Sequence, residues 1–131
     1  MNNLYIVAVM LISGFVNAQE WVEIGETSEG NTYFMQDKYS KVFASNNRKV
    51  WTKYFSDEFE LSNNVKIKNG YALILHEYNC EENTSMMHEM IFYNSEGKIV
   101  ERHKVEIYNR EWTDAVPDSL GEIMMEYACS L

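Results

Sequence analysis

The sequence predicts an α+β protein in which one C-terminal helix packs on a face of an antiparallel sheet. Residues 21–108 consist of strand-like segments separated by turn signals, whereas residues 119–131 carry the one clear helix pattern of the chain. The chain has two cysteines, Cys80 at the end of a strand-like segment and Cys129 in the predicted helix. A run of strands followed by a helix is typical of the α+β class.

Residues 1–18 have the features of a secretory signal peptide. The segment Leu4–Val16 is apolar and uncharged, but it is too short to anchor the chain in a bilayer. Val16 and Ala18 provide the small residues of a signal-peptidase site, so we expect cleavage after Ala18. Residues 1–3 lack the usual Lys or Arg, and a buried N-terminal strand or helix is the alternative interpretation.

The mature chain, residues 19–131, is long enough for one domain with one core. The formal charge of −9 at pH 7 would repel phosphates, so we expect no nucleic-acid partner. We expect no transmembrane segment in the mature chain. No cysteine follows the apolar segment. We therefore expect an exported protein of the periplasm, the cell surface or the extracellular space, without a lipid anchor.

Turn residues divide the strand region into hairpins. Asn69-Gly70 is the strongest of these turn signals, and we expect it to join residues 65–68 to the next strand. Gly97 ends another turn and is expected in the left-handed conformation. The predicted turns are Ser28–Gly30, Ser45–Arg48, Asn69–Gly70 and Asn94–Gly97.

The strand at residues 71–80 is the predicted centre of the sheet. Leu73 and Leu75 fall on one of its faces, and Ala72 and Ile74 fall on the other. Apolar residues on both faces indicate a strand that is covered on both sides.

The helix has a clear start signal. Ser119 and Glu122 have the spacing of a capping box, and Pro117 ends the structure before it. Apolar residues then recur at helical spacing and mark the face that we expect to pack on the sheet. These residues are Leu120, Ile123, Met124, Tyr127 and Leu131.

The two cysteines are expected to form a disulfide. Two thiols of an exported protein usually pair, and a Cys80–Cys129 bond would tie the end of the helix to the sheet. Closing a loop of about 50 residues would stabilise the fold by about 4 kcal/mol. A metal pair or a reactive thiol is the alternative, but the chain has no Cys-x-x-Cys spacing.

Met86, His88 and Met90 alternate along a strand-like segment, so we expect them on one face. Two thioethers and an imidazole suit Cu(I). The alternative is a packed face in which the methionines fill space under the helix and His88 lies at its edge. We predict no resident metal or cofactor and keep this copper set as an alternative.

No pattern in the sequence predicts catalysis. His76 and His103 could join His88 as ligands or acid–base groups, but both alternate with residues typical of a packed strand face. No serine has a nucleophile-elbow context, and the chain has no Gly-rich phosphate loop. The adjacent Glu81 and Glu82 would point to opposite sides of a strand. We therefore predict no catalytic residues and a non-enzymatic protein.

The aromatic residues are candidate binding anchors. Tryptophan and tyrosine are typical of interface hot spots. We expect Trp21, Trp51 and Trp112 to be buried instead; Trp51 shares a strand face with Phe55, as in a core strand. The tyrosines that we expect at exposed contacts are Tyr33, Tyr39, Tyr54, Tyr71 and Tyr108.

An acidic segment follows the first group of strands. We expect Asp57, Glu58 and Glu60 to lie in a solvated loop with Asn63 and Asn64. A calcium site is the alternative, but the segment lacks the D-x-D-x-D-G spacing.

A series of short motifs runs through the mature chain in a fixed order. "EWVEIG" begins at Glu20, "TYFMQD" ends at Asp37, and "KVW" and "LHEYNC" follow. "FYNSEGKIV" contains the predicted turn at Gly97, and "EWTDAVPDSLGEIMMEYAC" ends at Cys129. In order and spacing these motifs resemble the surface-adhesin protein E family over essentially the whole mature chain.

The resemblance implies both a fold and a function. The fold is an antiparallel sheet of about six strands, with the C-terminal helix tied to its concave face by the disulfide. The function is adhesion to extracellular-matrix or plasma proteins of a host.

We therefore predict an exported, non-enzymatic binding protein of the surface-adhesin E type, with a host matrix protein or a bacterial envelope protein as its partner. A periplasmic inhibitor or immunity-type protein is a second hypothesis, because an acidic surface complements a basic partner. A copper-binding envelope protein is a third, through Met86, His88 and Met90.

Overall fold

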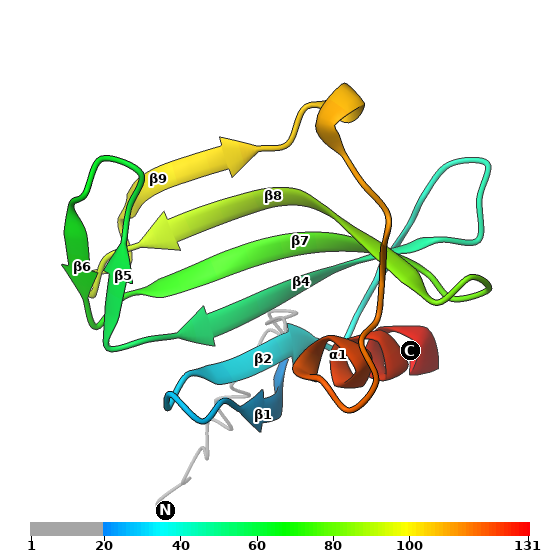
Figure 1. Cartoon of the computed structure of the whole chain (residues 1–131), viewed down its shortest axis with the longest axis horizontal. Coiled ribbons are helices and arrows are strands. Elements are labelled where there is room, and N and C mark those ends of the chain that lie inside the picture. Colours follow the sequence, from blue (N-terminus) through cyan, green and yellow to red (C-terminus); the bar gives the residue numbers. More distant parts are fainter. Residues whose placement is uncertain (1–19) are drawn as a thin grey trace, which may run out of the picture.

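The computed structural model of the chain describes residues 20–131. The predicted signal peptide, residues 1–18, lies outside the described residues. The main sheet has eight strands in the order β1-β2-β4-β7-β8-β10, with β3 paired to β4 and β9 paired to β8, and every pair is antiparallel (Figure 1). Its strands are β1 (Trp21–Glu26), β2 (Thr32–Gln36), β3 (Ser40–Lys41), β4 (Arg48–Phe55), β7 (Tyr71–Asn79), β8 (Thr84–Tyr93), β9 (Ile99–Lys104) and β10 (Thr113–Asp114).

The other elements are a small hairpin and two helices. Strands β5 (Glu58–Glu60) and β6 (Lys66–Lys68) form a separate two-stranded sheet. A 3-10 helix, η1 (Ile107–Asn109), interrupts the connection between β9 and β10, and the α-helix α1 (Leu120–Ser130) ends the fold. The predicted fold class is confirmed: a large antiparallel sheet carries one C-terminal helix. The strands of five or more residues are β1, β2, β4, β7, β8 and β9.

Three of the four predicted turns contain a glycine or asparagine with a positive φ. The fourth, predicted at Ser45–Arg48, lies earlier in the chain: Ala44 has the positive φ (58°), and Arg48 already belongs to β4. Gly30 (φ 84°) lies in the β1–β2 turn and Gly97 (φ 78°) in the β8–β9 turn, as expected. Asn69 (φ 56°) and Gly70 connect β6 to β7, but these two strands do not pair. Gly70 is required by a close approach, because a Cβ there would lie 2.2 Å from the carbonyl oxygen of Tyr93.

The loop prediction for the acidic segment is wrong for Glu58 and Glu60, which form β5 of the β5–β6 hairpin, whereas Asp57, Asn63 and Asn64 lie outside the strands. Glu58 and Glu60 alternate with the buried Phe59, and Ile67 on β6 is also buried. This alternation buries one side of the hairpin and leaves the acidic side chains in solvent. The turn of the hairpin contains Asn64 at a φ of 62°.

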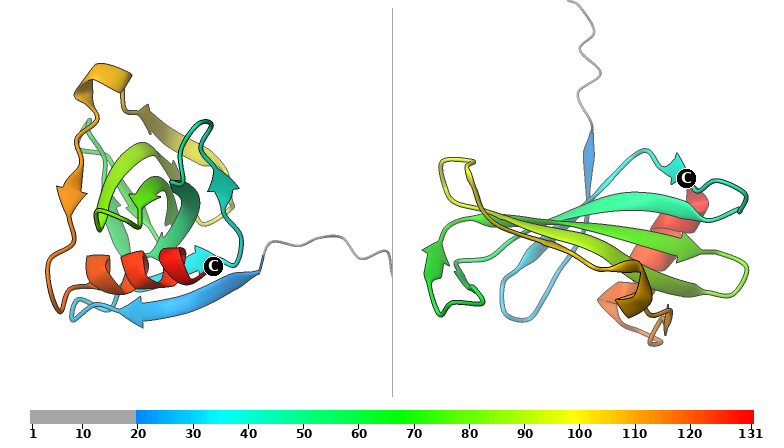
Figure 2. Two further views of the ribbon diagram at one scale, coloured as in Figure 1. Left: turned by 90° about the vertical axis from the view of Figure 1, so that its right-hand side faces the viewer. Right: turned by 90° about the horizontal axis from the view of Figure 1, so that it is seen from above.

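The core lies on one face of the main sheet, here called the inner face, which carries Val50, Ala72 and Tyr78. Residues directly opposite each other on antiparallel strands share a face, and the β4–β7 register pairs Val50 with His76 and Tyr54 with Ala72. One apolar cluster joins the inner face to α1, and a second joins it to the β5–β6 hairpin. The hairpin and α1 lie towards opposite ends of the sheet (Figure 1, Figure 2).

The start of α1 is confirmed, and of the five residues predicted to face the sheet, Leu120, Met124, Tyr127 and Leu131 pack in or against the core cluster. Ser119 is the N-cap, and its Oγ accepts a hydrogen bond from the backbone N–H of Glu122 at 3.3 Å. The buried helix residues are Met124, Met125 and Ala128, and Ile123 is 46% exposed. The end of the helix is tied to the sheet through Cys129, so the residues one and four positions before that cysteine also face the sheet.

Two ties hold the C-terminal end of α1 on the inner face. The predicted disulfide is confirmed: it joins Cys80, just after β7, to Cys129, and their Cα atoms lie 5.7 Å apart. The second tie is Arg48, whose Nη1 donates to the backbone oxygens of Ala128 and Cys129 at 3.1 Å and of Leu131 at 2.7 Å. A cation at the C-terminus of a helix also complements its dipole.

The prediction that β7 is covered on both sides is wrong for one side. β7 is a central strand between β4 and β8, and its inner face is covered as expected. Leu73 and Leu75 point to the opposite side, here called the outer face, to which neither apolar cluster extends. These leucines are half-buried, and side chains of neighbouring strands on the same face, such as Lys53 and Ile91, flank them.

Removing the disulfide should lower the free energy of unfolding. The double variant Cys80→Ala, Cys129→Ala is expected to lose about 4 kcal/mol, because the bond closes a loop with a sequence separation of 49 residues. Urea unfolding at pH 7 measures this loss, and the chemically reduced wild-type protein serves as the matched control. A loss below about 1 kcal/mol would show that the disulfide is not needed to hold the helix on the sheet.

Arg48→Met should also destabilise the protein, because it leaves helix carbonyls without their charged donor. Hydrogen bonds to charged groups contribute about 1.5–3 kcal/mol, and we expect a loss in that range from urea unfolding. Lys41→Met, at the exposed residue opposite Arg48 on β3, is the control and should change stability by less than about 0.5 kcal/mol. Equal effects of the two variants would contradict a specific role for Arg48.

Candidate binding surface

The outer face carries a row of aromatic side chains from adjacent strands. The strand register places Phe55 of β4 opposite Tyr71 of β7, and Tyr71 opposite Tyr93 of β8. The ring centroids of Phe55 and Tyr71 lie 5.7 Å apart, and those of Tyr71 and Tyr93 are stacked at 4.6 Å. Phe34 of β2 extends the row, with its ring edge-on to Phe55 at 5.8 Å. We call Phe34, Phe55, Tyr71 and Tyr93 the aromatic row.

Further apolar side chains lie beside the aromatic row on the outer face. Trp51 lies opposite Leu75, and Leu73 lies opposite both Lys53 and Ile91. Most of these side chains are half-buried, and Phe55 is 41% exposed. An apolar sheet face without a second layer is typical of a surface that binds another molecule.

Lys53 lies among the aromatic rings of the outer face. Its Nζ is 4.5 Å from the ring centroid of Tyr71, 5.2 Å from that of Phe55 and 5.6 Å from that of Trp21. These are cation–π distances. None of the ion pairs among the described residues involves Lys53, so the aromatic rings alone hold its ammonium group.

On strands β1 to β9 the outer face carries equal numbers of basic and acidic side chains, although the formal net charge of the whole chain is −9. Two of its carboxylates are buried and paired: Glu77 with His88, and Glu89 with Arg102. The register places on this face the bases Lys49, Lys53, Arg102 and Lys104 and the acids Glu23, Glu26, Glu77 and Glu89. The excess of acidic residues therefore lies elsewhere on the protein.

The expectation that Met86, His88 and Met90 share one face is wrong. Strand β8 has a bulge, because Leu75 pairs with Glu89 while His76 pairs with Met87, which leaves His88 between them. Met86 lies opposite Glu77 on the outer face, and Met90 lies opposite Ile74 on the inner face. The two thioethers are therefore on opposite sides of the sheet, and the copper set does not form.

His88 is instead part of a buried polar cluster beside the outer face. Its Nε2 lies 2.8 Å from Oε1 of Glu77, and both side chains are less than a tenth exposed. Asn47 donates from Nδ2 to the other oxygen of Glu77 at 2.8 Å. Burial lowers the pKa of His88, and this outweighs the hydrogen bond to Glu77, which favours the charged form. The imidazole is therefore neutral at pH 7, and the carboxylate of Glu77 is satisfied on both oxygens.

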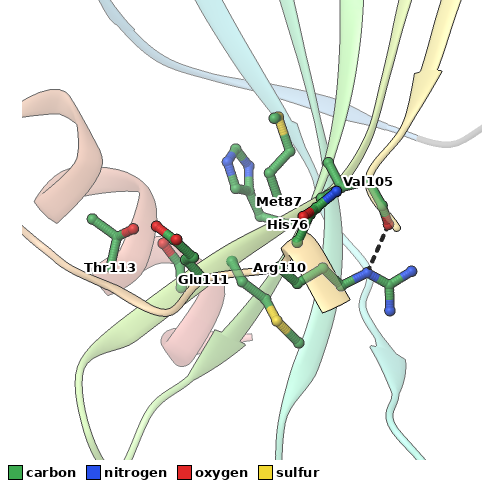
Figure 3. Close-up of a pocket in the computed structure, with 9 residues that line it drawn as sticks. His76, Met87, Val105, Arg110, Glu111 and Thr113 are labelled. Atoms are coloured by element: carbon green, nitrogen blue, oxygen red, sulfur yellow. Dashed lines mark hydrogen bonds between the residues drawn. The ribbon is translucent and has the colours of Figure 1, made fainter. Parts of the chain in front are cut away.

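A pocket of about 420 Å³ lies between β8 and the segment that contains η1 (Figure 3). His76 and Met87 lie on one side of it, and Glu111 and Thr113 lie on the other. Arg110 donates from Nε to the carbonyl oxygen of Val105 at 3.1 Å, and its guanidinium points away from His76 (Figure 3).

The pocket has no catalytic arrangement. Nδ1 of His76 is buried without a hydrogen-bond partner, and burial, with a smaller effect of His88, lowers the pKa of His76 to about 4. No hydrogen bond among the described residues joins His76 to an acidic or nucleophilic side chain, whereas a nucleophile–base pair requires one. At pH 7 the imidazole of His76 is neutral and lines one side of the pocket.

The other histidine lies apart. His103 is half exposed on β9, with its Nε2 3.1 Å from Glu101, so it does not join His76 and His88. It lies on the inner face of the sheet, opposite Met90, at a position where that face is exposed. Within residues 20–131, His, Cys, Asp and Glu side chains form no group of three that could hold a metal ion.

The predicted aromatic anchors have different environments. Trp21 and Trp51 are only half-buried, and Trp112 is 44% exposed, so the expectation of burial is wrong for Trp112. Tyr71 lies in the aromatic row, and Tyr108 is exposed as expected. The other tyrosines of the prediction, Tyr33, Tyr39 and Tyr54, are half-buried.

The sequence analysis missed Phe34, Phe55, Tyr93 and Lys53. One pattern could have revealed three residues of the row: Phe55 is the last residue of β4, Tyr71 the first of β7 and Tyr93 the last of β8. In an antiparallel sheet the last residue of one strand lies beside the first residue of the next. Aromatic residues next to turns can therefore line up across the strands, at one end of the sheet.

Comparison with known proteins identifies the family. The sequence model of the family described as Surface-adhesin protein E matches residues 21–130. Comparison with curated proteins and with solved structures gives no match. Among residues 20–131, no helix has the length and apolar character needed to cross a membrane.

The lowered pKa of His76 predicts a stability that falls on acidification. In the unfolded chain His76 takes up a proton below about pH 6.5, whereas in the fold it stays neutral down to about pH 4. The contribution of His76 is therefore fully present above about pH 6.5, and between pH 6.5 and 4 up to about 3 kcal/mol of it is lost. His76→Gln should remove this component from the pH dependence of urea unfolding. An unchanged slope between pH 7 and pH 4 would contradict the lowered pKa.

Proposed function

Because this chain belongs to the surface-adhesin protein E family, we propose that it is an exported, non-enzymatic binding protein that contacts a protein partner through its outer face. The observation that carries the proposal is the aromatic row on a sheet face without a second layer. Tyrosine and phenylalanine bury large areas with few rotatable bonds and are enriched at protein interfaces. The partner that we propose is a host extracellular-matrix or plasma protein.

The dimensions of the outer face suit a protein contact. Strands lie about 4.8 Å apart, and side chains on one face recur about every 7 Å along a strand. Three rows of side chains across six strands therefore cover on the order of 500 Å². A standard interface buries about 800 Å² per partner, so residues at the rim would complete the contact.

The inner face supports this use of the outer face. Behind the aromatic row the β5–β6 hairpin packs against Tyr54 of β4 and Ala72 of β7, and the disulfide and Arg48 hold α1 farther along the inner side of the same strands. A sheet that is packed on its inner face loses little conformational entropy when a partner binds to its outer face, and this favours affinity.

A second candidate is a periplasmic inhibitor or immunity-type protein. The net charge of −9 favours it, because acidic surfaces attract basic partners with rates that fall as salt increases. Protease treatment of intact cells separates the candidates: digestion is expected of an adhesin on the cell surface, and protection until the outer membrane is opened is expected of a periplasmic inhibitor.

Phe55→Ala should weaken binding to the partner. We expect at least one purified protein from a panel of host matrix and plasma proteins to bind, and we expect the variant to raise its Kd by about tenfold, as for an interface hot spot. Phe43→Ala is the matched control, because Phe43 is 98% exposed in the β3–β4 loop and should have no effect. Binding that is equally sensitive to both substitutions, or to neither, would contradict the outer face as the contact surface.

A further inference from the structure

The position of Lys53 restricts the chemistry of the partner. Its register neighbours are Phe34 on one side and Leu73 on the other, and three aromatic rings lie within 5.6 Å of its ammonium. This cation therefore lies in the middle of the apolar surface, away from the rim.

The two carboxylates that β7 and β8 carry on the outer face already have partners. Glu77 is satisfied by His88 and Asn47, and Glu89 is paired with Arg102. Lys53 has only the aromatic rings and, in the free protein, solvent, since the side chain is half-buried. The rings fix the position of its charge before any partner arrives, which lowers the entropic cost of pairing it.

A partner that covers the outer face would remove this solvent. An ammonium group that is buried without an anionic partner is strongly destabilising, and cation–π contacts replace only part of its hydration. An apolar partner without a negative group would therefore bind poorly, so complementarity requires an anion opposite Lys53.

We propose that the partner of the outer face is a protein segment that presents one aspartate or glutamate between apolar side chains, and that this carboxylate pairs with Nζ of Lys53. The inference rests on the proposed function, which assigns protein binding to the outer face. A polyanion is a poorer match, because the chain as a whole carries −9 and Glu23 and Glu26 lie on the same face. A single carboxylate among apolar groups avoids that repulsion.

Paired peptides test the inference directly. Each peptide of the panel has a central aspartate or glutamate flanked by apolar residues, and its twin has asparagine or glutamine at that position. Fluorescence polarisation at low and high salt gives the Kd of each twin for the wild-type protein. We expect the acidic twins to bind at least tenfold more tightly, with a preference that decreases at high salt.

Lys53→Met is the informative variant, because it keeps an unbranched apolar stem among the rings and removes the charge. In this variant the acidic and amide twins should have about the same Kd, and the Kd of the amide twins should be unchanged or lower than for the wild-type protein. Lys66→Met is the matched control: Lys66 lies on the β5–β6 hairpin, paired with Glu58, and its substitution should leave the preference intact. A urea unfolding curve for Lys53→Met identifies any loss of fold.

The outcomes separate this inference from the proposed function. Equal binding of the twins to the wild-type protein, a preference that survives in Lys53→Met, or no binding of any peptide up to 1 mM overturns the carboxylate inference. If both twins bind equally and Phe55→Ala weakens both, the outer face remains the contact surface and only the role of Lys53 is lost. If Phe55→Ala changes neither twin, the proposed function fails as well.

Discussion

The attachment of α1 to the inner face is the constraint on which the rest of the structure depends. A helix of 11 residues is marginal in water on its own, and α1 is held at its C-terminal end by the Cys80–Cys129 bond and by Arg48. With that end fixed, Met125 and Ala128 enter the core beneath the helix. Neither apolar cluster extends to the other side of the sheet, and that side is the one that we propose binds the partner.

The outer face combines two properties. Its aromatic and aliphatic side chains give a large contact area, and its carboxylates at Glu77 and Glu89 are buried and paired. The bulge at His88 contributes to this arrangement, because it brings the imidazole to the carboxylate of Glu77. Lys53, held among aromatic rings of this face, is the charge that we propose a partner pairs with a carboxylate.

Local features of the sequence predicted the fold, whereas the binding surface depends on relations between strands. The turns at Gly30 and Gly97 and the cap at Ser119 each follow from a few neighbouring residues, and the structure confirms all three. The bulge at His88 depends on pairing with a strand beyond the turn, so strict alternation gave the wrong face for Met90. The aromatic row likewise arises from the register of separate strands. Apolar residues on both faces of β7 predicted two covering layers, because a pattern within one strand does not distinguish a core from an exposed binding face.

Nuclear magnetic resonance tests most directly whether the outer face is the contact surface. The isotope-labelled protein is titrated with a protein or peptide that the binding panels identify. We expect the largest amide and side-chain shifts at the aromatic row and Lys53, with α1 and the segment around η1 nearly unchanged. Shifts concentrated on α1 or around η1, with the aromatic row unaffected, would contradict the assignment of the outer face as the binding surface.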